Sequence, residues 1–218
     1  MSLSLYFSPG ACSFVPHCLL QAAGVAFEPK MVKLHKGEQR EPAYQAINPR
    51  GQVPVLVDGD AVITQIAAIS VYLDEKFPQL GFLPQHGVAR AKALETLMWM
   101  NNTVHPTFTH VFMPGKFSDD AQVQANIKAH AQTSYGKLML ELQDLVKSAQ
   151  QSGQAWLSGE HFGPLDAYAL TLTRWGTMAG VNPQNIPLLW TFVERVAQHP
   201  PVQAVIARER LELNLFKS

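Results

Sequence analysis

The start of the chain combines a thiol with a sharp turn. Pro9-Gly10 precedes Cys12 and Ser13, and the following residues have the apolar pattern of a helix. The first N–H groups of a helix lack intrahelical partners and carry partial positive charge, so they stabilise a nearby thiolate and lower its pKa. We therefore expect Cys12 to be a reactive thiol. The alternative is a small, buried apolar side chain.

Charge and cysteine content exclude several classes of protein. The 218 residues include 17 basic and 17 acidic side chains, so the chain has no electrostatic footprint for nucleic acid or an anionic membrane. We see neither a secretory signal nor a run of about 18 apolar residues, and we expect a soluble, cytoplasmic protein. Cys12 and Cys18, six residues apart on one helix, would lie on different faces, which predicts neither a disulfide nor a metal site.

The first part of the chain is predicted to contain both strands and helices, which position Cys12 and Ser13. Up to about residue 80, apolar patterns and turn residues predict β-α-β followed by β-β-α. Gly24 ends the first helix, and Asp58-Gly59 is typical of a hairpin turn. The expected strands are 3–7, 27–34, one that ends at 57, and 61–63, and the expected helices are 14–23 and 65–77.

The rest of the chain is predicted to be helical. Apolar residues recur every three to four positions from Val123 to Leu145, which indicates a long amphipathic helix. Further helices are expected near 88–112, 165–179, 186–198 and 201–209. The change in pattern predicts a first domain over 1–80, a linker rich in proline and glycine over 81–87, and an all-helical domain over 88–218.

Four motifs in this order resemble the glutathione transferase superfamily. They are the segments Ser8 to Ser13, Asn48 to Pro54, Thr64 to Ile69 and Phe162 to Asp166, and the first most resembles the bacterial beta class. The resemblance spans nearly the whole chain. It implies an α/β thioredoxin-like N-terminal domain with a mixed four-stranded sheet, joined to an all-α C-terminal helical bundle.

The resemblance implies a glutathione site along two of these motifs. Pro54 would follow a cis peptide bond, and the Val53 backbone would pair with the cysteinyl amide of glutathione. Spacing alone fits a simple β-turn equally well. The N–H groups at Gln65 and Ile66 would take the γ-glutamyl carboxylate. An acid and a small residue usually stand there, so Gln65 has lost the charge and Ile66 supplies only its N–H.

Three further residues enter the glutathione site by resemblance. Gln52 belongs to the proline motif, and Lys36 could meet the glycyl carboxylate, or be an ordinary solvated lysine. Asn101 could reach glutathione across a homodimer interface. Glutathione is thus the expected co-substrate, with no metal.

Two thiol chemistries remain open in this family. Glutathione's own sulfur could attack an electrophile, with Ser13 or Tyr6 donating a hydrogen bond to it, or Cys12 could form a mixed disulfide with glutathione. His105 could polarise the site or move a proton, unless it is a surface or capping residue. The alternative for Ser13 is a helix cap, and for Tyr6 a structural strand residue.

The expected function is that of a transferase in detoxification. It would conjugate or reduce small hydrophobic electrophilic or peroxidic compounds with glutathione. The alternatives are a glutathione-dependent thiol-disulfide oxidoreductase using Cys12, and a non-catalytic interaction module. Four residues either form the wall of the co-substrate pocket or pack in the core: Phe108, Phe112, Met113 and Phe117. Asp166 is interpreted as a folding element, with Gly163 as a weak helix cap.

Overall fold

The N-terminal part of the chain folds around a mixed sheet. The computed structural model describes residues 3–216. Its strands lie in the order β2-β1-β3-β4, and they are β1 Leu3–Phe7, β2 Phe27–Met31, β3 Val55–Asp58 and β4 Ala61–Thr64. β1 pairs with β2 in parallel, and the β1–β3 and β3–β4 pairs are antiparallel. The four-stranded mixed sheet, the edge position of β2 and the turn at Asp58-Gly59 are all as predicted.

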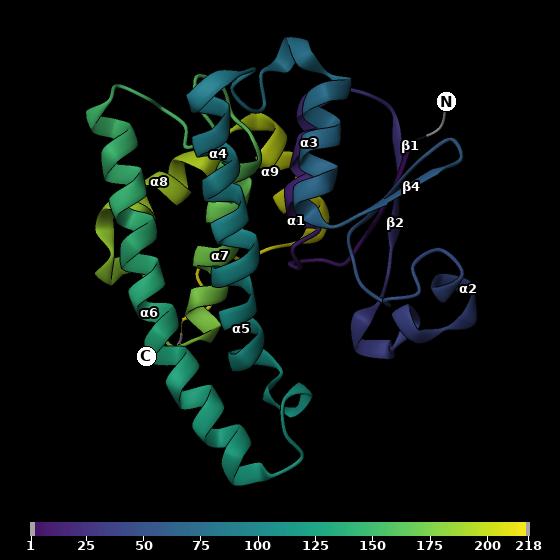
Figure 1. Ribbon diagram of the computed structural model, residues 1–218, viewed down its shortest axis with the longest axis vertical. Coiled ribbons are helices and arrows are strands. Elements are labelled where there is room, and N and C mark those ends of the chain that lie inside the picture. The colour runs from purple at the N-terminus through teal and green to yellow at the C-terminus, as the bar shows by residue number, and fades with distance from the viewer. Residues whose placement is uncertain (1–2, 217–218) are drawn as a thin grey trace.

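The two faces of the sheet are covered differently. Leu3, Leu5 and Phe7 point to the face covered by α1 (Phe14–Ala23) and α3 (Ile66–Lys76), and they belong to the main core. The other face carries a small cluster of Val32, Tyr44, Val53 and Val55, with Tyr44 supplied by the short helix α2 (Pro42–Gln45). Figure 1 shows the separation of α2 from α1 and α3.

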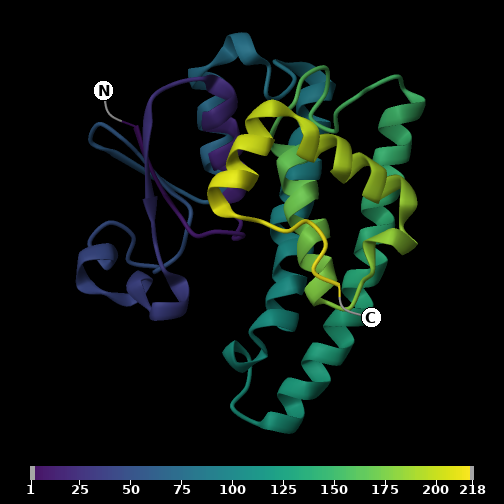
Figure 2. The same ribbon diagram turned by 180° about the vertical axis from the view of Figure 1, so that it is seen from behind.

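The remainder of the chain is helical. Its α-helices are α4 Gly87–Trp99, α5 His105–Phe112, α6 Ala121–Gln151, α7 Pro164–Met178, α8 Pro187–Gln198 and α9 Pro200–Glu209. The central helix α7 is buried along nearly its whole length. Both α7 and α9 pack on α1, and Figure 2 shows α9 returning from the far end of the chain to lie there. One apolar core therefore continues from the sheet into the helices.

This continuity bears on the domain prediction. The structure changes from mixed to helical between Lys76 and Gly87, near the expected boundary. The division into folding units at 1–80 and 88–218 stays a prediction.

Two predicted elements differ from the structure. The second strand ends at Met31 instead of residue 34, because a 3-10 turn begins at Leu34. The helix expected over 88–112 is interrupted by a π-helical segment, Met100–Val104. Pro106 has no N–H to bond the carbonyl four residues earlier, and a widened turn accommodates the loss. As a result His105 begins a new helix.

The start of α7 explains why glycine stands at position 163. A Cβ there would overlap the Phe82 carbonyl oxygen, so only glycine fits. The missing capping hydroxyl is supplied by Ser158, whose Oγ accepts a hydrogen bond from the Leu165 N–H at 3.1 Å. Asp166 accepts from the N–H groups of Leu157 and Gly163. The interpretation of Asp166 as a folding element agrees with these contacts, and Gly163 stands at the expected N-cap position, where Ser158 supplies the side-chain hydrogen bond that glycine lacks.

Candidate active site

The turn that carries the thiol lies between β1 and α1. We call residues 8–13 the thiol turn. The Ser13 hydroxyl closes it by accepting a hydrogen bond from the Ser8 N–H at 3.0 Å and donating to the Ser8 carbonyl oxygen at 3.2 Å. Ser13 is 0% exposed and its side chain caps no helix. Ser13 stands at the N-cap position of α1 without a side-chain cap, and its hydroxyl is engaged with Ser8, so its role as a donor to a ligand's sulfur stays a prediction.

Cys12 is half-buried at the edge of the turn. Its Sγ donates a hydrogen bond to the Val53 carbonyl oxygen at 3.4 Å. Burial raises the pKa of the Cys12 thiol to about 12, outweighing the lowering by the backbone N–H groups of Cys12 and Ser13. The prediction of a lowered pKa is thus wrong, because removal from water opposes the charge more than the helix start favours it. Cys18 is fully buried in the core.

The proline motif stands directly against Cys12. The Val53–Pro54 peptide bond is cis, as the resemblance implied. The loop before it is fixed by Tyr44 and Asn48, whose side chains donate to the Gln52 carbonyl oxygen at 2.7 and 2.8 Å. The Gln52 side chain itself is exposed. The Val53 carbonyl and the Cys12 sulfur thus meet at the start of β3.

The α3 start, residues 65–68, is open. Gln65 precedes the helix with φ of 74°, a left-handed conformation that is uncommon for a residue other than glycine. Its side chain is exposed and caps no N–H. The Ile66 side chain is only 3% exposed and belongs to the core, so this residue can offer a ligand its backbone alone. The first N–H groups of α3 remain available to an anion.

His105 belongs to a buried polar and aromatic group. Its Nδ1 lies 2.8 Å from the Tyr168 hydroxyl, which also donates to Asn101 Oδ1 at 3.4 Å. The imidazole packs edge-on against Trp175, with ring centroids 4.8 Å apart. Burial, and to a smaller extent the charge of Lys116, lower the pKa of His105 to about 4. The imidazole is therefore neutral at physiological pH and cannot supply a positive charge to the site.

Trp175 links this group to the thiol turn. Its indole Nε1 donates to the Gly10 carbonyl oxygen at 2.9 Å, across the boundary between the two parts of the chain. Phe108 stacks on Trp175 at 4.7 Å and on Phe112 at 5.6 Å. Phe108 is buried, whereas Phe112 is 61% exposed, and Met113 and Phe117 are exposed as well. Of the four residues expected in a pocket wall or in the core, only Phe108 is a core residue.

The remaining predicted site residues, Tyr6, Lys36 and Asn101, lie outside the thiol turn and the α3 start. Tyr6 sits on the sheet face away from α1, edge-on to Tyr44 at 5.8 Å and near the Lys30 ammonium. Lys36 is exposed in the 3-10 turn Leu34–Lys36. Asn101 lies in the π-helical segment and shares a hollow with Gln65. That hollow lies between α3 and α4 and is lined by Gln65, Ala67, Ala68, Val71, Tyr72, Glu75, Met98 and Asn101.

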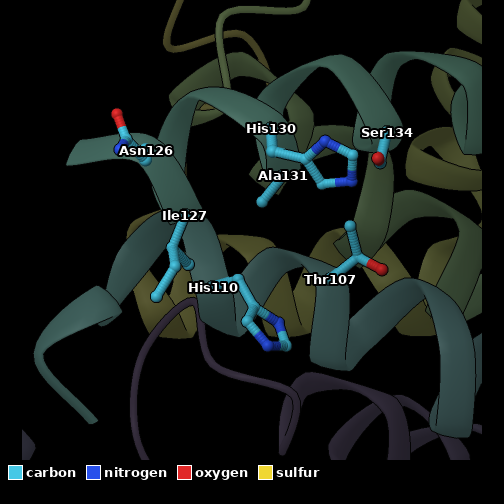
Figure 3. A pocket seen from close by; sticks show the side chains of 7 residues that line it. All are labelled: Thr107, His110, Asn126, Ile127, His130, Ala131 and Ser134. Atoms are coloured by element: carbon cyan, nitrogen blue, oxygen red, sulfur yellow. The ribbon is translucent and has the colours of Figure 1, made fainter. Parts of the chain in front are cut away.

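A second hollow lies between α5 and α6 and contains none of the predicted site residues. Figure 3 shows its lining side chains, which come from these two helices: Thr107, His110, Asn126, Ile127, His130, Ala131 and Ser134. Within residues 3–216 no group of three or more His, Cys, Asp or Glu side chains is placed to hold a metal ion. None of the helices described over the same range is long and apolar enough to cross a membrane.

Sequence reasoning missed Tyr168, the contact of Trp175 with the thiol turn, and the role of Ser158 at α7. The thiol turn and Pro54 could be identified because each lies within a short sequence motif, Ser8 to Ser13 and Asn48 to Pro54. Tyr168 and Trp175 lie more than sixty residues from their partners, and a buried helix offers no pattern that singles them out.

Comparison with known proteins finds a family that matches the first part of the chain and a relative that matches nearly all of it. The family described as "Glutathione S-transferase, N-terminal domain" matches residues 1–75. A glutathione S-transferase of Xanthomonas campestris pv. campestris is 32% identical over 216 residues, covering 96% of this chain and all of the relative.

Solved structures agree with these matches. A glutathione S-transferase from Xylella fastidiosa has a TM-score of 0.85 at 31% identity, covering 96% of this chain and 100% of that one. A sphingomonad enzyme complexed with glutathione has a TM-score of 0.80 at 29% identity, and a beta-class enzyme from Sphingomonas chungbukensis 0.81 at 26%, both with the same coverage. The chain therefore belongs to the glutathione S-transferase family, with members of the bacterial beta class among its structural neighbours.

Proposed function

We propose that the protein binds glutathione and catalyses bond formation between the glutathione sulfur and a small electrophilic carbon, so that the whole glutathionyl group is transferred. The observation that carries the proposal is the meeting of Cys12 with the Val53 carbonyl oxygen at 3.4 Å, beside a cis proline. An extended tripeptide that pairs with the Val53 backbone has its own thiol next to Cys12. Support also comes from the sphingomonad relative, which is complexed with glutathione.

The α3 start supplies the second half of glutathione binding. The γ-glutamyl carboxylate lies against the free N–H groups that follow Gln65, where the helix end favours negative charge. Gln65 offers an amide to the ligand's ammonium group but no charge. Lys36 and Gln52, both exposed, face the glycyl end, and Asn101 approaches from the helical part. A second copy of the chain against α3 and α4 gives the proposed homodimer.

The reaction is a nucleophilic displacement by the glutathione thiolate. The proton leaves the glutathione thiol for solvent, the sulfur forms a bond to the electrophilic carbon, and the leaving group departs with its electron pair. With its pKa near 12, Cys12 stays protonated, and its S–H turns from the Val53 carbonyl oxygen to donate a hydrogen bond to the thiolate. The residues therefore hold and orient the glutathione sulfur, and they supply no second nucleophile.

The raised pKa also separates conjugation from disulfide exchange. A mixed disulfide needs Cys12 as a thiolate, which burial disfavours. Conjugation needs only an ionised glutathione. We therefore place conjugation of small hydrophobic electrophiles, in a cytoplasmic detoxification role, before the oxidoreductase function.

The test uses purified wild type and Cys12→Ala with three measurements: glutathione binding by calorimetry, conjugation of chlorodinitrobenzene, and reduction of hydroxyethyl disulfide. We expect binding and conjugation in the wild type, and conjugation within about tenfold in the variant, since the hydrogen bond that is lost comes from a thiol, which is a weak donor. If folded wild-type protein does not bind glutathione, the non-catalytic interaction module replaces this proposal. Disulfide reduction that exceeds conjugation and disappears in Cys12→Ala identifies an oxidoreductase instead.

A further inference from the structure

A row of stacked rings leads away from the thiol turn along α5. Trp175, whose indole donates to the Gly10 carbonyl oxygen, stacks on Phe108 with centroids 4.7 Å apart and ring planes at 18°. Phe108 in turn stacks on Phe112 at 5.6 Å and 14°. Trp175 and Phe108 are buried, whereas Phe112 is 61% exposed. The row therefore begins beside the thiol turn and ends in solvent.

The α5 surface beside this row carries no charge. His105 and Phe112 fall on one face of α5, two turns apart, which is about 10 Å along the helix axis. Between them, the Thr109 hydroxyl donates to the His105 carbonyl oxygen at 3.3 Å, so its proton is already used. The His105 imidazole is neutral. This face is thus a mostly apolar strip, long enough for one benzene ring with a substituent at each end.

A lysine stands beyond the exposed end of the row. Lys116 closes the 3-10 turn Pro114–Lys116, and the next residue, Phe117, stacks on His110 of α5 at 4.0 Å. Figure 1 shows this segment at the lower end of the helical part, between α5 and the start of α6. The charge of Lys116 contributes to the lowered pKa of His105, so the ammonium group lies within electrostatic range of the strip.

The charge of Lys116 is not neutralised by the chain itself. Among residues 3–216, none of the ion pairs includes Lys116. Of the two acids that follow, Asp120 is committed to the start of α6, where its Oδ1 accepts from the N–H groups of Gln122 and Val123 at 2.8 and 3.0 Å. Asp119 and Lys116 are both exposed. The combination of an exposed ring with an exposed cation fits a ligand that has a flat apolar body and a negative charge.

We propose that Lys116 is a specificity-determining residue, which selects planar aromatic electrophiles with a carboxylate at the end opposite the reacting carbon. The ring of the co-substrate lies along α5 beside Phe112, its carboxylate meets Lys116, and its reacting carbon faces the thiol turn. The glutathione sulfur bonds that carbon, and the leaving group departs with its electron pair. This inference rests on the proposed function and names its class of co-substrate.

Matched acids and amides test the proposal. In 4-chloro-3-nitrobenzoate the reacting carbon lies opposite the carboxylate, and 4-chloro-3-nitrobenzamide is its uncharged counterpart. Relative to their rates with free glutathione, we expect kcat/KM to favour the acid by about threefold to fivefold, the range of an exposed ion pair. The preference should fall as salt rises. In 2-chloro-3-nitrobenzoate the carboxylate adjoins the reacting carbon, so this acid should show no preference over its own amide.

Substitutions assign the preference to Lys116. Lys116→Met keeps a long apolar stem and removes the charge, so the ratio of acid to amide should fall to about one. Lys116→Glu should invert the ratio by about threefold to fivefold. Lys147→Met, at an exposed position near the far end of α6, is the matched control and should keep the wild-type ratio. A merely structural role of Lys116 would change the rates of acid and amide together.

A binding measurement makes the test independent of turnover. In 4-methyl-3-nitrobenzoate a methyl group replaces the chlorine, so the compound cannot react. Its affinity is compared by calorimetric titration with that of its amide, in wild type and in Lys116→Met. We expect tighter binding of the acid by about threefold to fivefold in the wild type only.

Each outcome decides one of the two proposals. An acid-to-amide ratio that is equal in wild type and Lys116→Met, for both conjugation and binding, overturns the role of Lys116. Conjugation of chlorodinitrobenzene without any preference for the acid supports the proposed function and rejects the role of Lys116. Preferential binding of the acid, lost in Lys116→Met, in a protein that neither binds glutathione nor conjugates supports the anion site and rejects the proposed function.

Discussion

The thiol turn and the α3 start face the same proposed ligand but are built in opposite ways. The thiol turn is held at Gly10 by Glu209 and Trp175 and closed internally by the Ser13 hydroxyl. The α3 start has an exposed Gln65 in a left-handed conformation, and no side chain caps it. One end is fixed before the ligand arrives, whereas the other keeps its donors free for the ligand. Substitutions should therefore change stability and geometry at the first end, and affinity at the second.

The largest effect is expected for Trp175→Ala. Trp175 is 5% exposed, stacks on Phe108, contacts His105 and bonds Gly10. Removing a buried tryptophan typically costs about 3–5 kcal/mol, and we expect that loss in the free energy of unfolding measured with urea. The control is Trp190→Ala on α8, which removes a more exposed indole.

The result for Trp175 decides whether the thiol turn is held more firmly than the α3 start. A loss no greater than that of Trp190→Ala would contradict the comparison. Trp175→Phe keeps one aromatic ring but removes the donor to Gly10 and part of the buried indole. It should cost less than Trp175→Ala, about 1–3 kcal/mol.

The second effect concerns pH and the neutral His105. Its pKa of about 4 in the folded protein lies below the ordinary value of 6.5, so the unfolded chain binds more protons between these values. The free energy of unfolding should therefore fall as pH drops from about 6.5 to about 4, by at most about 3 kcal/mol for this group. The measurement is urea unfolding across this range for wild type and His105→Asn.

The difference between the two pH profiles isolates His105 from other titrating groups. His35→Asn, at an exposed position, is the matched control for the loss of an imidazole. A variant profile as steep as that of wild type would show that His105 is not the group that burial keeps neutral.

The third effect is the slow reaction of Cys12. Raising its pKa from 9.0 to about 12 lowers the thiolate fraction at neutral pH by about a thousandfold, and the higher nucleophilicity recovers about twentyfold. Alkylation by iodoacetamide should therefore be about fiftyfold slower than for an ordinary cysteine. The reference is an unfolded sample of the same protein, where Cys12 has its ordinary pKa. If folded protein is alkylated faster than this unfolded reference, the pKa of Cys12 is lowered, as the sequence analysis predicted.

Local patterns predicted most of the fold, but not the surroundings of the side chains at the candidate site. Glycine at 24 and the hairpin residues at 58–59 act within a few positions, so the end of α1 and the turn between β3 and β4 were predicted to the residue. Burial of Cys12 depends on neighbours distant in sequence, and it reversed the expected direction of the pKa shift of this thiol. The contact of Glu209 with Gly10 spans 199 positions, a separation at which no local pattern acts.

The smallest effect on stability is expected at Gln65. At this position we also expect stability and affinity for glutathione to change independently. Glycine adopts a positive φ without strain, so Gln65→Gly should raise the free energy of unfolding by about 1 kcal/mol. The same change removes the amide that faces the ligand's ammonium group, so the dissociation constant for glutathione should rise.

Gln65→Glu completes this test in the opposite direction. A carboxylate at the α3 start gains from the helix dipole and pairs with the ammonium group, so glutathione should bind about three- to tenfold more tightly, with unfolding changed by less than about 1 kcal/mol. Calorimetric titration at low and high salt checks this, because an exposed ion pair weakens as salt rises. We expect Gln65→Gly to be more stable than the wild type and to bind glutathione more weakly. If affinity and the free energy of unfolding instead change in the same direction in both variants, the α3 start contributes to the framework as much as the thiol turn does.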